Sequence, residues 1–146
     1  MKIFGNLQFW QGSSQYGNVN SDGSSSIGGG SLFVDRGDIG ACDWTSGSFT
    51  KDATWRDLDC SAIVPANAKF IQFDVHLVAP SVGTFFGLRK KGYTGGYSYT
   101  GVYVPSNGAA CQQQLLVPCD SSRFVQYYVV NTTYTNIDVK VTGWIL

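Results

Sequence analysis

Few side chains in this sequence are of the types that carry acid–base or nucleophilic catalysis. The only histidine is His76, so a Ser-His-Asp arrangement would depend on this one residue, and a site with several histidine ligands is excluded. The sequence contains no GxSxG, HExxH or P-loop motif. We interpret His76 as a structural residue and predict that the protein has no catalytic residues and is not an enzyme.

Asp57 and Asp59 are the carboxylates that lie closest together in the sequence. In an extended segment they would point to the same side and could reach one cation. They do not fit an EF-hand loop, which needs further oxygen ligands at fixed spacings and a final glutamate. Glycoside hydrolysis needs two carboxylates that face each other across a cleft, and no local pattern indicates such a pair. We therefore predict no metal site and no cofactor.

The four cysteines, Cys42, Cys60, Cys111 and Cys119, have spacings that match no compact zinc-binding motif. The first residues of the chain do not resemble a secretory signal, which favours reduced thiols that are buried as small apolar side chains. The alternative is one disulfide bond, for which Cys111 and Cys119 on the two sides of a hairpin are the favoured pair.

Four tyrosines form the one cluster that indicates a binding surface, namely Tyr93, Tyr97, Tyr99 and Tyr103. In a strand over residues 97–104, three of them would share one face, with Tyr93 in the preceding turn. Tyrosine rings can stack on sugar rings or anchor a protein interface. Packing against neighbouring strands is the other interpretation. Glycan binding by these four tyrosines is our alternative prediction for the function.

The elements that would position these residues are strands. Within residues 69–78 the apolar side chains occupy every second position, and polar ones lie between them. This alternation has a period of two residues, which is typical of a half-buried β-strand and does not suit a helix. We predict that this segment is the central strand of the fold, and that Pro80 ends it.

Other strand-like segments recur every 10 to 15 residues or so, separated by turns rich in Gly, Pro and Asn. They are 84–90, 97–104, 110–117, 124–131 and a last segment around Ile137, Val139 and Val141. The chain has 18 glycines and no glutamate, and no segment has a helical pattern of useful length. The sequence therefore predicts an all-β, jelly-roll-like antiparallel sandwich over residues 32–146.

Residues 1–31 differ from the rest of the chain in composition. The first ten residues include five large apolar side chains, and 13 of the 21 residues from 11 to 31 are Gly or Ser. The apolar residues are Ile3, Phe4, Leu7, Phe9 and Trp10. A Gly/Ser-rich segment of this kind acts as a flexible tether. The apolar segment could pair with its own domain or dock on another chain, and we favour an extended attachment arm.

The charge and hydropathy of the chain argue against two classes of partner. The formal net charge is zero, and the only basic run is Arg89-Lys90-Lys91, whereas nucleic-acid-binding proteins usually have a basic face. No segment approaches the roughly 20 consecutive apolar residues of a membrane-spanning helix. We predict neither a nucleic-acid partner nor a membrane partner.

Three segments, TWRDLDCSAIVPANAKFIQFDVHL, FGLRKKG and VKVTGWIL, carry a resemblance to a known kind of module. They resemble a β-sandwich module of bacteriophage virion appendages, over residues 53–146. The residues that carry the likeness are Trp55, the Ser61–Pro65 turn, Ala68-Lys69, Arg89, Gly92 and Gly143-Trp144-Ile145. The resemblance implies a structural protein of the virion, as a head fibre, capsid decoration or tail-fibre component. It also implies oligomers and assigns no catalytic residue.

Two of the predicted strands have apolar side chains on both faces. Segment 124–131 is one of them, and in the last strand Trp144 would lie on the face opposite Val139 and Val141. A sheet in a two-layer sandwich has only one inner face. We therefore predict a homo-oligomer, with a trimer as the favoured state and with Tyr127, Tyr128 and Trp144 at or near the interface.

Overall fold

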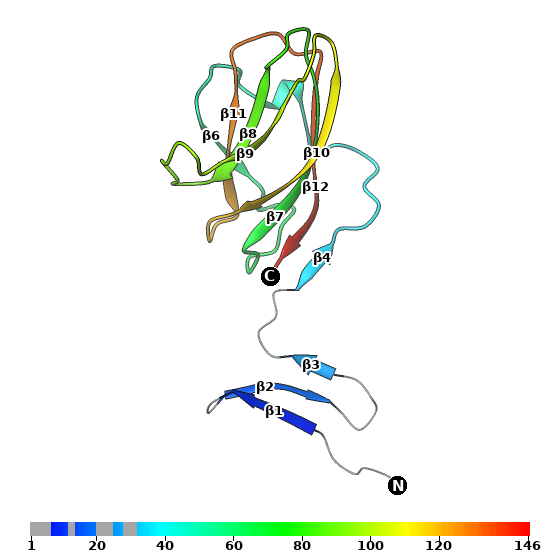
Figure 1. The fold of residues 1–146 in the computed structure, drawn as a ribbon, viewed down its shortest axis with the longest axis vertical. Coiled ribbons are helices and arrows are strands. Elements are labelled where there is room, and N and C mark those ends of the chain that lie inside the picture. The colour runs from blue at the N-terminus through cyan, green and yellow to red at the C-terminus, as the bar shows by residue number, and fades with distance from the viewer. Residues whose placement is uncertain (1–6, 12–13, 20–24, 28–31) are drawn as a thin grey trace. The chain divides into compact units, whose positions relative to one another are not determined.

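The structure is a computed structural model that describes residues 7–11, 14–19, 25–27 and 32–146. The chain divides into two compact units, Met1–Leu32 and Phe33–Leu146. In the first unit, β1 (Leu7–Gln11), β2 (Ser14–Val19) and β3 (Ser25–Ile27) form an antiparallel sheet in the order β1-β2-β3 (Figure 1). Of the residues expected to attach the arm, Leu7, Phe9 and Trp10 lie in β1, and Ile3 and Phe4 lie outside the described residues.

The second unit consists of two antiparallel sheets packed as a sandwich (Figure 1), which confirms the predicted fold class. The larger sheet has the order β10-β7-β12-β4, with β5 paired to β12, and the smaller sheet has the order β6-β11-β8-β9. The strands of the larger sheet are β4 (Phe33–Asp35), β5 (Trp44–Thr45), β7 (Phe70–Val78), β10 (Ala110–Pro118) and β12 (Asn136–Ile145). Those of the smaller sheet are β6 (Arg56–Asp59), β8 (Phe85–Lys90), β9 (Thr100–Tyr103) and β11 (Phe124–Val129).

The strand β7 lies between β10 and β12 in the larger sheet, as the alternating sequence predicted. Its four inward side chains, Ile71, Phe73, Val75 and Leu77, have no exposed surface. On the opposite face of the strand, Asp74 accepts two hydrogen bonds from the Gln112 amide at 2.7 and 3.0 Å. The period of two residues therefore separates a dry inner face from a polar outer face.

Between the sheets, Phe86, Leu88 and Tyr127 of the smaller sheet meet the inner face of the larger one. The Phe49 ring packs edge-on against both Phe86 and Tyr127, with ring centroids 5.2 and 5.0 Å apart. The Tyr127 hydroxyl accepts a hydrogen bond from the Thr50 amide at 3.1 Å. Tyr127 is 5% exposed, so its placement at a subunit interface is wrong, and it belongs to the core.

A bulge in β12 corrects the expected orientation of Trp144. The register of β12 against β7 shifts between Val141 and Gly143, so that Trp144 pairs with Ile71. Paired residues point to the same face, and Ile71 is a core residue without exposed surface. Trp144 therefore lies on the inner face and packs against the core, whereas strict alternation placed it on the outer face.

The four cysteines are free thiols, as predicted, but the prediction that they are buried holds only for two of them, since Cys111 is partly exposed and Cys42 is exposed. The two buried thiols are Cys60 and Cys119. The disulfide alternative is wrong, because Cys111 lies in β10 and Cys119 directly follows the same strand. Two residues at the two ends of one extended strand cannot approach within the distance that a disulfide bond requires.

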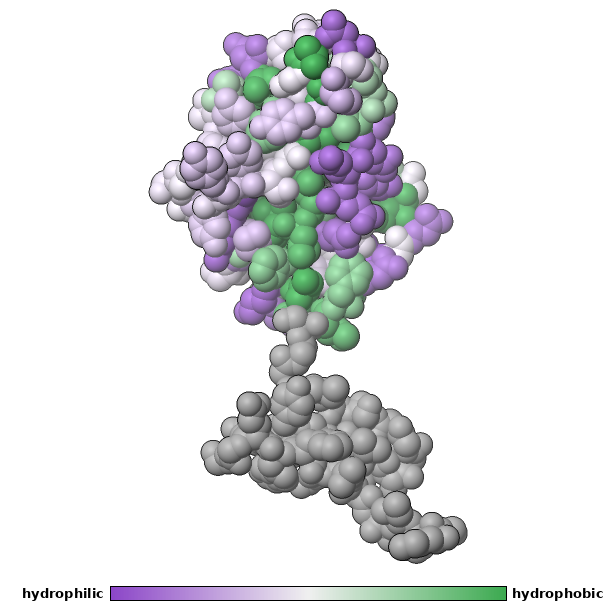
Figure 2. Space-filling model, viewed as in Figure 1, coloured by the Kyte–Doolittle hydropathy of each residue, from purple (hydrophilic) through white to green (hydrophobic). Residues whose placement is uncertain are grey.

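Helical structure is minimal in the described ranges. The one helical element there is the single 3₁₀ turn Ser46–Ser48, which follows β5. No helix among these residues is long and apolar enough to cross a membrane. On the face of the second unit seen in Figure 2, hydrophobic residues form a strip with hydrophilic residues on both sides.

Candidate ligand-binding surface

The tyrosines of the predicted cluster do not lie on one strand face. The strand β9 begins at Thr100, so Tyr97 and Tyr99 belong to the loop before it and only Tyr103 lies in the strand. Tyr97 is fully exposed, and Tyr93 is 41% exposed. Tyr93 and Tyr97 line one surface hollow and Tyr103 lines another, and Tyr99 lines both.

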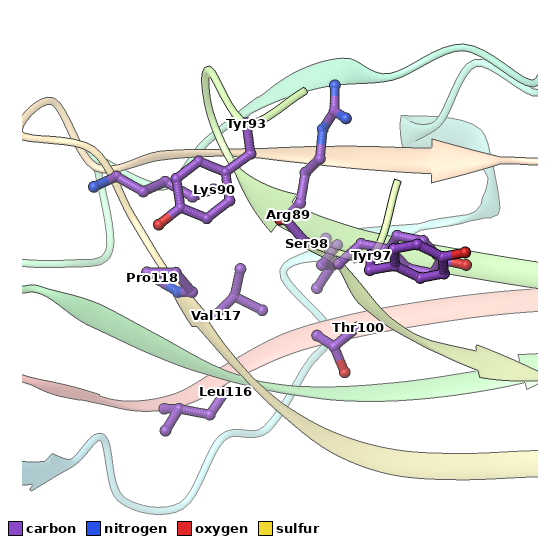
Figure 3. Close-up of a pocket in the computed structure, with 11 residues that line it drawn as sticks. Arg89, Lys90, Tyr93, Tyr97, Ser98, Thr100, Leu116, Val117 and Pro118 are labelled. Carbon is purple, nitrogen blue, oxygen red and sulfur yellow. The ribbon is translucent and has the colours of Figure 1, made fainter. Parts of the chain in front are cut away.

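The first hollow lies between the β8–β9 loop and the strand β10, and has a volume of about 300 Å³. Figure 3 shows Lys90 and Tyr93 near each other on one side, and Leu116, Val117 and Pro118 along β10. The Lys90 ammonium lies 5.8 Å from the centre of the Tyr93 ring, a distance at which a cation is attracted to the ring face. This hollow is lined by both polar and apolar side chains, and one of them, Tyr97, is fully exposed.

The second hollow, which we call the aromatic pocket, has a volume of about 370 Å³ and lies on the outer face of the smaller sheet. Its aromatic side chains are Trp55, Phe85, Tyr99, Tyr103 and Tyr128. The rings of Phe85 and Tyr103 are stacked, with centroids 4.4 Å apart and an angle of 29°. The Trp55 ring lies 5.3 Å from Tyr128 and 5.9 Å from Tyr99. These distances place the five rings in one continuous contact network.

Two glycines explain how the Phe85 ring can lie against the sheet. Gly87 pairs with Gly101 across β8 and β9. A Cβ atom on Gly101 would lie 2.3 Å from the Phe85 ring, and one on Gly87 would lie 2.7 Å from it. Real Cβ atoms do not approach other atoms this closely, so the ring occupies the space that two side chains would otherwise fill. Phe85 is consequently only 8% exposed, although it points away from the core.

At one edge of the aromatic pocket the Arg89 guanidinium lies over the Trp55 ring, 4.1 Å from its centre. Its Nε donates a hydrogen bond of 2.9 Å to the Gln126 side chain, which in turn donates one of 3.1 Å to Asp57. The Lys91 ammonium, 2.6 Å from Asp57, lowers the pKa of that carboxyl. The polar groups along this edge therefore have partners within the protein.

Asp57 and Asp59 do not form a shared cation site. Asp59 accepts a hydrogen bond of 2.8 Å from the Ser61 amide, and this bond lowers the pKa of Asp59. Asp57, in β6, forms an ion pair with Lys91, the residue that directly follows β8. No group of three His, Cys or Asp side chains in the described part of the chain is arranged to hold a metal ion.

His76 lies in a polar hollow of about 180 Å³ on the outer face of the larger sheet, beside Cys42 and Asp138. Its Nδ1 is 3.6 Å from the Asp138 carboxylate. Cys42 is exposed, and the partial desolvation of its thiol raises the pKa of that group, which the Asp138 charge raises further. A raised pKa leaves a smaller fraction of the thiol as the nucleophilic thiolate.

Sequence reasoning missed three aromatic residues of the pocket, namely Trp55, Phe85 and Tyr128. Tyr128 lies in a strand that is apolar on both faces, so alternation alone does not separate its core residues from its surface residues. The usable signal was on β8, where Phe85 shares a face with Gly87 and Arg89 while Phe86 and Leu88 face the core.

No protein-family model matches the chain, and no curated protein matches it.

Proposed function

We propose that this protein is a non-enzymatic structural component of a bacteriophage virion, either a capsid decoration or head-fibre protein or a tail-associated one. In this proposal residues 1–31 attach the protein to other virion proteins. The resemblance of the three segments named above to virion appendage modules supports it. The composition of residues 1–31 differs from that of the sandwich, which supports a separate role in attachment for these residues.

The observation that carries the proposal is the division of the chain into two compact units at Leu32 and Phe33. The second unit has its own hydrophobic core, whose buried members lie between Phe49 and Val141. A domain with a core of its own folds without help from a neighbouring segment. The second unit therefore does not need residues 1–31 for its own folding, which supports a separate role for them in attachment.

Deletion of residues 1–31 tests this proposal. The remaining sandwich is expected to fold, with the same midpoint of unfolding as the full chain, because its core is complete. Mixed with particles that lack the protein, the truncated chain is expected to leave them undecorated, whereas the full chain decorates them. Full occupancy by the truncated chain would show that the attachment site lies in the sandwich.

We also propose that the protein forms homotrimers. Of the three aromatic residues predicted to lie at the interface, Tyr127 and Trp144 pack in or against the core, and Tyr128 lines the aromatic pocket. Large apolar side chains also remain exposed on the larger sheet, including Phe33 at 48% and Phe70 at 38%. Contact between subunits is a common way to cover such groups.

A further inference from the structure

The aromatic pocket contains more aromatic surface than the folding of the sandwich requires. The core between the sheets is complete without it, because Phe85 and Tyr103 point to the outer face. Tyr99 is 41% exposed and Tyr103 is 53% exposed, so two ring surfaces remain in water. Clustered apolar groups that stay exposed on a folded protein often mark a binding site.

The floor of this pocket is formed before any ligand arrives. The Phe85 ring fills the space above Gly87 and Gly101, and Tyr103 stacks on it at 4.4 Å. The Tyr99 and Tyr128 rings also pack against the Phe85 ring, with centroids 5.6 and 6.1 Å from it. A ligand that meets rings already fixed by packing loses little additional conformational entropy of the protein on binding.

The size and chemistry of the pocket define a class of ligand. Its volume of about 370 Å³ is at the lower end of the range of small-molecule sites, roughly 300–1,000 Å³. The ring faces carry partial negative charge, and they attract the weakly positive C–H groups on the flat face of a pyranose ring. The phenol groups of Tyr99 and Tyr103 can exchange hydrogen bonds with sugar hydroxyls at the rim.

The charges around the pocket argue against other ligands with flat faces. No Lys, Asp or His lines it, and the nearby Arg89 is already engaged with Trp55 and Gln126. Proteins that stack nucleic-acid bases on aromatic rings combine those rings with a positively charged groove for the backbone. A charged sugar or a phosphate would have no free partner of opposite charge among these residues.

We propose that the aromatic pocket is a binding site for neutral glycans, in which Tyr103, Tyr99 and Trp55 contact the flat face of one pyranose ring. Phe85 is a positioning residue that supports Tyr103 from beneath. This site is distinct from the hollow beside Tyr93 and Tyr97, and it does not depend on the proposed location of the protein in a virion.

The test uses the purified full chain on an array of immobilised neutral tetrasaccharides of glucose, galactose and N-acetylglucosamine. The wild-type protein is expected to bind at least one of them, and Tyr103→Ala is expected to weaken that binding roughly tenfold or more, the effect of losing a central aromatic contact. Tyr97→Ala is the matched control, because Tyr97 is fully exposed and does not line the aromatic pocket. It is expected to bind as the wild type does.

Thermal unfolding and tryptophan fluorescence provide two further tests. Tyr97→Ala should unfold at the wild-type midpoint because its side chain is fully exposed, and Tyr103→Ala should remain folded under the assay conditions, with a somewhat lower midpoint because it loses the stacking on Phe85. Titration with the bound tetrasaccharide should change the tryptophan fluorescence of the wild type but not of Trp55→Phe. Absence of binding to every sugar on the array would overturn the proposal. So would light scattering that shows Tyr103→Ala dissociating an oligomer, since the pocket would then be a subunit contact.

Discussion

At the scale of single residues, Tyr134 makes the stability of the fold depend on pH in the alkaline range. Its hydroxyl donates a hydrogen bond of 3.0 Å to the backbone carbonyl oxygen of Phe85, a residue that lines the aromatic pocket. Burial raises the pKa of this phenol above the ordinary value of 10.0. The folded protein therefore holds the phenol proton more tightly than the unfolded chain does.

Because the folded-state pKa is raised, the stabilisation from Tyr134 is fully present below about pH 10 and declines as the pH rises above that value. Tyr134→Phe is expected to lower the free energy of unfolding at neutral pH by about 1 kcal/mol, the net value of one hydrogen bond. Urea unfolding at neutral pH and at about pH 11 should show this deficit shrinking at the higher pH.

The control for this prediction is Tyr97→Phe, which removes a hydroxyl group that is fully exposed. It is expected to leave stability unchanged at both pH values. A deficit for Tyr134→Phe that stays constant between them would show that the Tyr134 phenol does not resist ionisation in the folded protein.

At the scale of elements, the pairing of β8 with β9 depends on two glycines, which have no side chain. Gly101 faces Gly87 across the two strands, and a Cβ atom at Gly101 would lie 2.4 Å from the Phe86 carbonyl oxygen as well as 2.3 Å from the Phe85 ring. Gly101→Ala is expected to lower the free energy of unfolding by about 1–3 kcal/mol, the usual cost of overpacking. Chemical denaturation measures this loss.

Gly96→Ala is the matched control for this substitution. Gly96 precedes β9 in the loop, and a Cβ atom there would have open space around it. Its effect is expected to stay within about 0.5 kcal/mol, as is usual for surface substitutions. Equal losses for the two variants would mean that the intrinsic preferences of glycine and alanine, and not the contact with Phe85, set the cost.

At the scale of the whole molecule, the bulge in β12 changes which surface is available for assembly. Trp144 packs against the core, so Trp144→Ala is expected to lower the free energy of unfolding by about 2–4 kcal/mol, as large-to-small core substitutions do. Val82→Ala, at a side chain that is 61% exposed, is expected to change it by less than about 0.5 kcal/mol.

Light scattering separates this effect from assembly. The full chain is expected to have the mass of a trimer, and Trp144→Ala is expected to retain that mass under conditions in which it is folded. If Trp144→Ala were monomeric with an unchanged unfolding midpoint, this result would show that Trp144 lies at the subunit interface. A wild-type monomer at high micromolar concentration would overturn the proposed trimer.

The sequence by itself determined the class of fold and its central strand. Alternation with a period of two residues is a local property, because successive side chains of any strand point to opposite faces. It identified Ile71, Phe73, Val75 and Leu77 as core residues, and all four have no exposed surface. The turn residues between the strands are local signals in the same way.

Only the tertiary structure decided the features that depend on strand pairing. A bulge adds one residue to one strand of a pair, and every later side chain of that strand then changes face, so alternation misplaced Trp144. The aromatic pocket combines Trp55, Phe85, Tyr103 and Tyr128 from segments far apart in the sequence. These residues meet because β11 and β9 both pair with β8, and the local pattern of a strand does not specify its partners or its register.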